Sequence, residues 1–197
     1  GMGYVEQEIN RQAEKGRIDK DSVPWLLNLV EPTLDYADMA DCDFVIEAVL
    51  EEMPIKKKVY GELEEHVSET CILATNTSSL SVTEMASDLK HPERVVGFHF
   101  FNPVAAMPLL EIVKAEKTSD PALITAFDTG RKLGKRCVLC KDAPAFIVNR
   151  LLLRSMVETL KLVDEGNDFK EVDDALWAMG GPMPPFVLMP ARSCGNM

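Results

Sequence analysis

Short apolar runs that alternate with amphipathic segments constrain the fold of this chain more than any other feature. Uninterrupted runs stand at residues 42–51 (CDFVIEAVLE), 71–75 (CILAT), 95–100 (VVGFHF) and 136–140 (RCVLC). Such runs are typical of buried strands, and the first suits a central strand of a parallel sheet, covered on both faces. Helical spacing separates them, as in IKKKVYGELEEHV at residues 55–67. The alternation of strand and helix predicts an α/β fold with a parallel sheet.

Capping residues predict where several helices begin and end. A helix is expected over about residues 3–15, ended by Gly16. Ser81 and Glu84 have the spacing of a capping box, which predicts the start of a short helix. Asp120 precedes a proline, and we expect it to cap a further helix.

The pattern changes near residue 142. From residue 144 onward the apolar residues show helical spacing alone, in AFIVNRLLLRSMVETLKLVDEG and DFKEVDDALWAMGG. The sequence therefore predicts one domain over residues 1–142 and a helical domain over residues 143–197. The second, at about 55 residues, is too small to be a complete domain.

Composition excludes several classes of protein. A formal charge of -11 and a pI of about 4.8 disfavour a nucleic-acid partner. No apolar run approaches the roughly 20 residues that span a membrane, and the opening residues lack the apolar core of a signal peptide. Five cysteines without framework spacing indicate a reducing, intracellular setting.

Cys137 and Cys140 form a C-x-x-C within a predicted strand. Side chains at i and i+3 of a strand face opposite sides, so this pair is badly placed to chelate a metal or to form a disulfide. No second pair completes a zinc site. We expect structural thiols and no metal centre.

The stretch from Arg94 to Lys114 holds the most distinctive chemistry. Two apolar runs flank Phe-Asn-Pro, with His99 in the first run and Glu111 in the second. If neighbouring strands bring them together, Glu111 can accept a proton from one ring nitrogen of His99 and leave the other free as a base. The alternative is a core histidine that is satisfied by a buried acid.

Polar residues at strand ends are further candidates, because ligands of open parallel sheets bind beyond the carboxyl ends of the strands. Three such places are VLE at residues 49–51, NTSS at 76–79 and HFFNP at 99–103. Ser78 stands in the second, and its alternative role is hydrogen bonding within a turn. Asn149 lies inside an apolar helical segment, where hydrogen bonding between domains is the alternative.

Four segments together resemble the L-3-hydroxyacyl-CoA dehydrogenases. They are ADCDFVIEAVLE, ATNTSSLSVTEMA, PERVVGFHFFNPVAAMPLLEIVKAEKTSD and KDAPAFIVNR. PTLDYA and DFKEVD are most similar to the dehydrogenase part of multifunctional fatty-acid β-oxidation proteins. The likeness is collinear over about residues 3–189. It implies a partial Rossmann-like NAD-binding domain followed by a truncated all-helical C-terminal domain.

The resemblance also implies roles for particular residues. His99 matches the catalytic base and Glu111 its orienting partner. Ser78 matches a serine that contacts substrate and nicotinamide, and Asn149 matches an asparagine that approaches the substrate from the helical domain. Residues that match contacts to the NAD cofactor are Glu51, Lys56, Ser78 and Asn102. The implied reaction transfers hydride from C3 of a 3-hydroxyacyl-CoA to NAD.

The sequence departs from the family pattern at several places. It contains no G-x-G-x-x-G, the loop that holds the cofactor pyrophosphate at a helix N-terminus in this family. Ala145 stands where family members have glycine. Pro184 replaces a glycine and Pro190 stands near the position of an acid, and the following ARSCGNM does not resemble the family.

Three hypotheses follow from the sequence. The leading one is a piece of a 3-hydroxyacyl-CoA dehydrogenase, inactive or weakly active by itself. The others are a non-enzymatic crystallin-like binding or structural protein on the same scaffold, and another β-hydroxyacid dehydrogenase, which the HFFNP stretch disfavours. For the leading hypothesis we expect an acyl-CoA substrate and a homodimer or a multifunctional β-oxidation complex. The expected location is the bacterial cytoplasm or, alternatively, the mitochondrial matrix.

Overall fold

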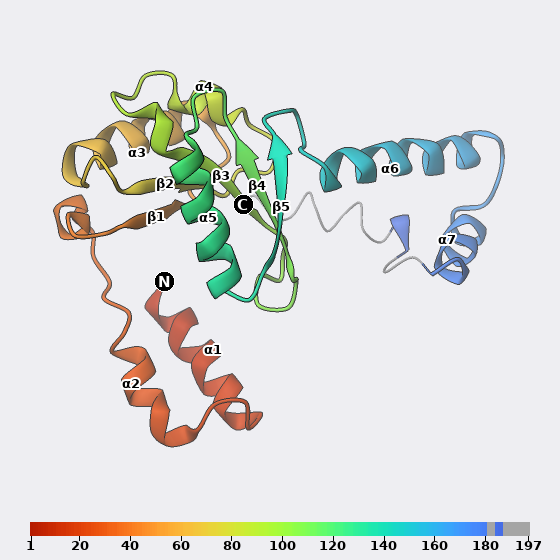
Figure 1. Ribbon diagram of the computed structural model, residues 1–197. Helices are drawn as coiled ribbons and strands as arrows, with labels where there is room; N and C mark the ends of the chain where they lie inside the picture. Colours follow the sequence, from red (N-terminus) through yellow and green to blue (C-terminus); the bar gives the residue numbers. More distant parts are fainter. Residues whose placement is uncertain (181–183, 187–197) are drawn as a thin grey trace. The chain divides into compact units, whose positions relative to one another are not determined.

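Residues 1–180 and 184–186 are described by the structure, a computed structural model, and the chain divides into two compact units (Figure 1). The first unit ends at Ala40 and the second begins at Asp41. Pro190 and the segment ARSCGNM, for which the sequence departs from the family pattern, lie outside the described residues.

The first unit consists of short helical segments. Helix α1 (Met2–Glu14) packs with α2 (Val23–Leu27), and the 3₁₀ turns are Lys20–Ser22 and Tyr36–Met39. Gly16 has a φ of +66° and donates its N–H to the carbonyl of Ala13. It ends α1 as predicted, because glycine adopts the left-handed conformation at little cost.

The second unit is built on a five-stranded sheet, in the order β1 (Phe44–Glu47), β2 (Ile72–Thr75), β3 (Val95–Phe100), β4 (Leu109–Lys114) and β5 (Arg136–Lys141). The predicted strands are thus confirmed, although β1 ends at Glu47, before the last four residues of the apolar run at 42–51. β1, β2 and β3 are parallel, β4 is antiparallel to β3, and β5 is parallel to β4. Residues 101–108 join β3 to β4. A parallel crossover needs about a dozen residues or more, so this short link forces the direction of β4 to reverse.

The helices of the second unit are α3 (Met53–His66), α4 (Val82–Ala86), α5 (Asp120–Lys132), α6 (Val148–Asp164) and α7 (Phe169–Ala178), with a 3₁₀ turn at Pro92–Arg94. Ser81 caps α4 by accepting the N–H of Glu84, which confirms that prediction. α5 is capped by Ser119, one residue before the predicted Asp120. Beyond residue 144 the described residues form helices and no strand, as expected.

Alternation along β3 and β4 sorts their side chains onto two faces. Val96, Phe98, Leu110 and Ile112 form a buried core with Ala122, Leu123 and Ala126 of α5. The intervening residues face the other side, toward α4, where a Cβ on Gly97 would lie 2.5 Å from that of Val113. Only glycine permits this close approach of β3 and β4. His99 and Glu111 share this second face.

Two placements in the sheet differ from the prediction. β1 is an end strand with Ile46 41% exposed, because no described segment pairs with its outer side. β5 is the opposite end strand, and Leu139 is 52% exposed there, so the predicted burial of RCVLC holds for Cys140 but not for the whole run. β4 lies inside the sheet, because β5 pairs with its far side.

Candidate active site

The candidate site is centred on a buried pair of side chains from β3 and β4. His99 and Glu111 are opposite each other in the register, 5% and 0% exposed. His99 Nδ1 lies 2.7 Å from Glu111 Oε2, so the predicted hydrogen bond is confirmed. A carboxylate can only accept, so Nδ1 carries a proton, and in the neutral form of the ring Nε2 keeps its lone pair. Among the described residues, none hydrogen-bonds Nε2.

The other oxygen of Glu111 holds the start of α6. Oε1 accepts the backbone N–H groups of Ile147, at 3.0 Å, and Val148, at 2.9 Å. A carboxylate at a helix N-terminus is stabilised by the unpaired N–H groups and by the helix dipole. One carboxylate therefore orients the imidazole of His99 and docks the helical segment on the sheet.

Two aromatic rings flank the imidazole. The ring centroids of Phe101 and Phe146 lie 4.6 and 5.6 Å from that of His99. Phe146 is 3% exposed and has a φ of +46°, and Ala145 before it has a φ of +62°. Backbone strain of this kind often accompanies functional sites. Here it places an aromatic ring against the candidate base.

The loop after β2 is fastened by Glu51. Glu51 Oε1 accepts from Thr77 Oγ1 at 2.6 Å, from the N–H and hydroxyl of Ser78 at 2.8 and 3.2 Å, and from the N–H of Ser79 at 3.3 Å. Burial opposes the charge of Glu51, but these hydrogen bonds and the charge of Lys56 together outweigh it and lower the pKa of this carboxyl. The carboxylate and the loop form one rigid element.

Asn149 joins α6 to the same loop. Its side chain is buried, and Nδ2 donates to the carbonyl of Ser78 at 3.3 Å. This hydrogen bond agrees with the alternative role of Asn149, which is to join two parts of the chain. Contact between Asn149 and the substrate stays a prediction. The structure thus brings together four predicted catalytic residues: His99, Glu111, Ser78 and Asn149.

The remaining predicted cofactor residues have different surroundings. Lys56 is 1% exposed, and its ammonium faces Glu47 and Glu51 at 2.7 and 3.4 Å. Asn102 is exposed in the loop after β3 and lies outside this hydrogen-bond network. Of these residues, Glu51 is placed beside Ser78, and Lys56 lies beneath it.

Two acids of the site were missed by sequence reasoning. Glu47 is 3% exposed at the end of β1, and its signal was a lone carboxylate inside the apolar run FVIEAV. Asp142 follows β5 and accepts from the Ser81 hydroxyl and from the N–H groups of Val82 and Thr83, at 2.8–3.1 Å. No local signal identifies Asp142, because its partners lie about 60 residues away.

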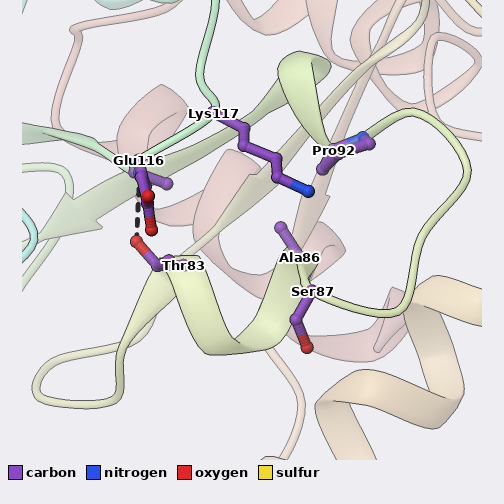
Figure 2. A pocket seen from close by; sticks show the side chains of 7 residues that line it. Thr83, Ala86, Ser87, Pro92, Glu116 and Lys117 are labelled. Atoms are coloured by element: carbon purple, nitrogen blue, oxygen red, sulfur yellow. Dashed lines mark hydrogen bonds between the residues drawn. The ribbon is translucent and has the colours of Figure 1, made fainter.

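Cysteines and a small pocket lie apart from this network. Burial and then the charge of Glu111 raise the pKa of Cys140 to about 11, so its thiol is unreactive at neutral pH. No described group of three or more His, Cys, Asp or Glu side chains could hold a metal ion. A pocket of about 130 Å³ lies between α4 and the loop after β4. Figure 2 shows Lys117 along its wall and the hydrogen bond in which Thr83 Oγ1 accepts the N–H of Glu116. The four predicted catalytic residues do not line it.

Comparison with known families decides the identity of this arrangement. Residues 1–143 match the family model described as 3-hydroxyacyl-CoA dehydrogenase, NAD binding domain, and residues 146–191 match the C-terminal domain of the same family. The chain belongs to the 3-hydroxyacyl-CoA dehydrogenase family. The Rossmann-like α/β class predicted from the sequence is thereby confirmed.

Relatives of this dehydrogenase family chain include the fatty acid oxidation complex subunit alpha of Pseudomonas putida, 41% identical over 96% of the chain. The chain spans 26% of that relative's length. Among solved structures, the (S)-3-hydroxybutyryl-CoA dehydrogenase from Ralstonia eutropha is 30% identical, with a TM-score of 0.91 over 94% of this chain and 66% of that one. The 3-hydroxybutyryl-CoA dehydrogenase from Escherichia coli is 33% identical, with a TM-score of 0.89 over 93% of this chain and 39% of that one.

The same comparisons bear on the remaining hypotheses. They give no support to the crystallin-like alternative, since the relatives and neighbours named above carry oxidation or dehydrogenase names. Within the described residues, every helix is too short or too polar to cross a membrane.

Proposed function

We propose that this chain carries the catalytic groups of a dehydrogenase that oxidises an L-3-hydroxyacyl-CoA to the 3-ketoacyl-CoA in fatty-acid β-oxidation. The observation that carries the proposal is the 2.7 Å hydrogen bond between His99 Nδ1 and Glu111, with Nε2 left unpaired among the described residues. Family membership supports the reaction class, and the name of the Pseudomonas putida relative supports the pathway.

His99 acts as the base in this proposal. Its Nε2 takes the proton of the substrate hydroxyl, which leaves the ring cationic. Glu111 is 0% exposed and hydrogen-bonded to Nδ1, so it stabilises that cation and keeps the ring in one tautomer. Because the backbone N–H groups of Ile147 and Val148 fix its other oxygen, the carboxylate does not swing away during the transfer.

Ser78 and Asn149 orient the substrate. The Ser78 hydroxyl is held by Glu51, and the Asn149 amide is held by the carbonyl of Ser78. Both groups therefore stand in fixed positions, which lowers the entropic cost of aligning the reacting carbon. They hold the substrate oxygens so that the hydrogen on C3 faces the cofactor.

The residues at the carboxyl ends of β1, β2 and β3 fit part of NAD, which supplies the hydride acceptor when bound. Glu51, with a side chain 20% exposed, the half-buried Ser78 and the exposed Asn102 offer polar groups suited to the nicotinamide and ribose. The 197-residue sequence has no G-x-G-x-x-G for the pyrophosphate. The fit is thus to one half of the cofactor.

The proposal extends to organisation and location. The cofactor-binding part comprises residues 1–142 and the helical part begins at residue 143, a division supported by family matches that end at 143 and resume at 146. The substrate is an acyl-CoA, and the assembly is a homodimer or a multifunctional complex in the cytoplasm. Bacterial relatives named as subunits of a fatty acid oxidation complex support this choice.

NADH binding, followed by fluorescence, tests the proposal. The two proteins are these 197 residues and a chimera in which the family's strand–glycine loop–helix unit precedes Gly1. We expect the chimera to bind NADH at least about a hundredfold more tightly, because each charge-assisted hydrogen bond to the pyrophosphate contributes roughly 1.5–3 kcal/mol. The chimera should also oxidise 3-hydroxyacyl-CoA.

Two outcomes contradict the proposal. Low-micromolar NADH binding by the 197 residues alone means that the cofactor occupies a different site. A chimera that binds both NADH and acyl-CoA but turns nothing over means that His99 and Glu111 do not perform this reaction.

A further inference from the structure

Asp142 fastens the end of β5 to the start of α4. Its Oδ2 accepts the hydroxyl of Ser81 and the N–H of Thr83, both at 2.8 Å, and its Oδ1 accepts the N–H of Val82 at 3.1 Å. Burial opposes the charge of Asp142, but the hydrogen bonds from these three residues outweigh it and lower the pKa of the carboxyl. Asp142 is therefore ionised at neutral pH, with both oxygens bonded.

Helix α4 already has a cap of its own. Ser81 accepts the N–H of Glu84 at 3.2 Å, and this bond satisfies the start of the helix in the usual local way. Asp142 adds bonds between positions about 60 residues apart in the chain. Capping a helix of five residues does not account for them, whereas fixing the segment that follows Asp142 does.

That segment, residues 143–146, is a tight turn. The carbonyl of Ala143 accepts the N–H of Phe146 at 3.0 Å, and Pro144 stands at the second position. Ala145, at the third, has the positive φ of a type II turn, where glycine is preferred. Phe146 has a positive φ as well. Two successive non-glycine residues persist in this conformation only where the surrounding structure holds them there.

Carboxylates hold both ends of the turn. Asp142 fixes the residue before it, and Glu111 Oε1 accepts the two backbone N–H groups that follow it, at 3.0 and 2.9 Å. The other oxygen of Glu111 lies 2.7 Å from His99 Nδ1. Between the two carboxylates stands Phe146, 3% exposed, with its ring centroid 5.6 Å from that of His99.

We propose that Asp142 is a positioning residue, which together with Glu111 keeps the turn in its strained form and so holds the ring of Phe146 against the imidazole of His99. The ring limits the planes that the imidazole can adopt. The consequence for turnover rests on the proposed role of His99. The consequence for the turn does not, so it can be measured with no ligand present.

The first test is NMR of the histidine ring protons, which belong to three residues of the 197-residue chain. Asp142→Asn removes the charge and one acceptor. We expect it to move the signals of His99, because they depend on the ring of Phe146, and to leave those of His91 in place. Glu64→Gln is the matched control, since Glu64 likewise accepts two backbone N–H groups, one of them from His91. It should move the signals of His91 and leave those of His99.

A double-mutant cycle with Ala145→Gly tests whether Asp142 maintains the strain. Ala145→Gly should raise Tm in the otherwise unchanged chain, because glycine tolerates the positive φ. In Asp142→Asn the same substitution should give less than about half that rise, because a turn freed at one end no longer holds alanine in the left-handed conformation. In Glu64→Gln the rise should be undiminished.

His99 signals that stay in place in Asp142→Asn, or that move as far in Glu64→Gln, would overturn the proposal. Equal gains from Ala145→Gly with and without Asp142 would overturn it too. Where Asp142→Asn does not fold, Ser81→Ala takes its place, because it removes one of the three bonds to Asp142. It should move the His99 signals by a smaller amount, and no movement there would overturn the proposal as well.

Failure of this inference and failure of the proposed function give different results. If the signals and the cycle behave as expected but turnover of the chimera does not depend on His99, the positioning by Asp142 stands and the proposed function fails.

Discussion

The two ends of β3 hold buried ion pairs with similar burial. They differ in the chemistry of the nitrogen that each pair leaves without a hydrogen-bond partner. Arg94, directly before the strand, is 3% exposed and pairs with Glu64, whose carboxylate also accepts the N–H groups of Lys90 and His91. His99, near the other end, is 5% exposed and pairs with Glu111. The first pair ties α3 to the turn before β3, because Glu64 belongs to α3 and its carboxylate binds the N–H groups of Lys90 and His91. The second leaves Nε2 of the imidazole without a partner among the described residues, toward the carboxyl end of β3.

Burial and pairing therefore do not identify a site by themselves. The His99 pair is joined by a hydrogen bond of 2.7 Å and the Arg94 pair by one of 3.4 Å, and each ring or guanidinium keeps one nitrogen, His99 Nε2 or Arg94 Nε, without a hydrogen-bond partner among the described residues. The difference lies in the chemistry of the free nitrogen and in its position. Arg94 Nε–H can only donate a hydrogen bond, whereas a neutral imidazole can take a proton at Nε2. His99 also lies toward the carboxyl ends of the parallel strands, where ligands of this fold class bind. The comparison predicts that substitutions at the two ends will have different effects on turnover and similar effects on stability.

The largest expected effect is that of His99→Gln in the glycine-loop chimera. Turnover should fall by about 10²–10⁴-fold, since in the proposed reaction the imidazole takes the proton of the substrate hydroxyl, while NADH affinity should change little. His91→Gln is the control, because His91 pairs with Glu69 and Glu93 outside the site. Steady-state rates together with NADH titration measure both quantities. Equal losses of turnover and affinity in His99→Gln would mean that this histidine is structural.

Glu111→Gln and Glu64→Gln compare the two carboxylates directly. Each substitution weakens a charged hydrogen bond, and each should cost about 1–3 kcal/mol of unfolding free energy. Only Glu111→Gln removes the charge that stabilises an imidazolium, so it should also lower turnover by about 10–100-fold. Thermal unfolding and turnover of the same samples give the two readouts.

Equal losses of turnover in Glu64→Gln and Glu111→Gln, at equal unfolding free energy, would contradict the predicted difference between the two pairs. In that case the loss would follow the order of the sheet and not the chemistry of the pair.

Lowering the pH should weaken the hydrogen bonds of Glu51 and Glu64, and each carboxyl should affect a different set of backbone N–H groups. Burial opposes the charge of Glu51 and Glu64, but the hydrogen bonds from Thr77 and Ser78 to the first and from Lys90 and His91 to the second outweigh it, so each pKa is lower than its ordinary 4.5. A carboxyl with a lowered pKa in the folded state contributes stability above its unfolded pKa. This stability is lost as pH falls through the folded value.

We therefore expect unfolding free energy to be nearly constant above about pH 5 and to fall below pH 4.5. Glu51→Gln or Glu64→Gln should reduce that slope. Amide shifts of Ser78 and Ser79 should titrate with Glu51, and those of Lys90 and His91 with Glu64. Titration of all four amides with a single midpoint, unaltered by either substitution, would contradict the assignment.

Local sequence patterns predicted the elements and the His99–Glu111 pair well, because these depend on short distances along the chain. Apolar runs marked the strands. The link over residues 101–108 was short enough to pair its flanking runs, and alternation placed both side chains on one face. The capping residue of α5 was misplaced by one position, since both Ser119 and Asp120 can accept an N–H.

Long-range features were not predictable from the same patterns. An apolar run indicates a buried strand but not which neighbours it has, so the run at residues 42–51 was expected to be covered on both faces and β5 was expected to be buried. Lys56 lies in an amphipathic helix where a lysine normally faces water. Its burial depends on Glu47, which belongs to a different element. Asp142 bonds residues about 60 positions earlier, a distance that no local motif spans.

The smallest expected effect concerns backbone strain, which also separates the two ends of the sheet. Among the described residues, the two non-glycine residues with positive φ are Ala145 and Phe146, and both lie beside the His99–Glu111 pair. A left-handed alanine costs roughly 1–2 kcal/mol relative to glycine, whereas glycine adds about 0.4–1 kcal/mol of unfolded-state entropy. Ala145→Gly should therefore stabilise the chain by up to about 1 kcal/mol, a rise in Tm of about 2–4 °C.

Ala126→Gly is the matched control for that prediction. Ala126 is fully buried in the middle of α5, where the same substitution should destabilise by about 1 kcal/mol or more, because it adds backbone entropy and removes packing. Thermal unfolding of the two variants should thus shift in opposite directions. If both lower Tm, the positive φ of Ala145 carries no strain that glycine can relieve. If Ala145→Gly raises Tm and leaves turnover of the chimera unchanged, the conformation of Phe146 against His99 is set by packing and does not depend on the strained alanine.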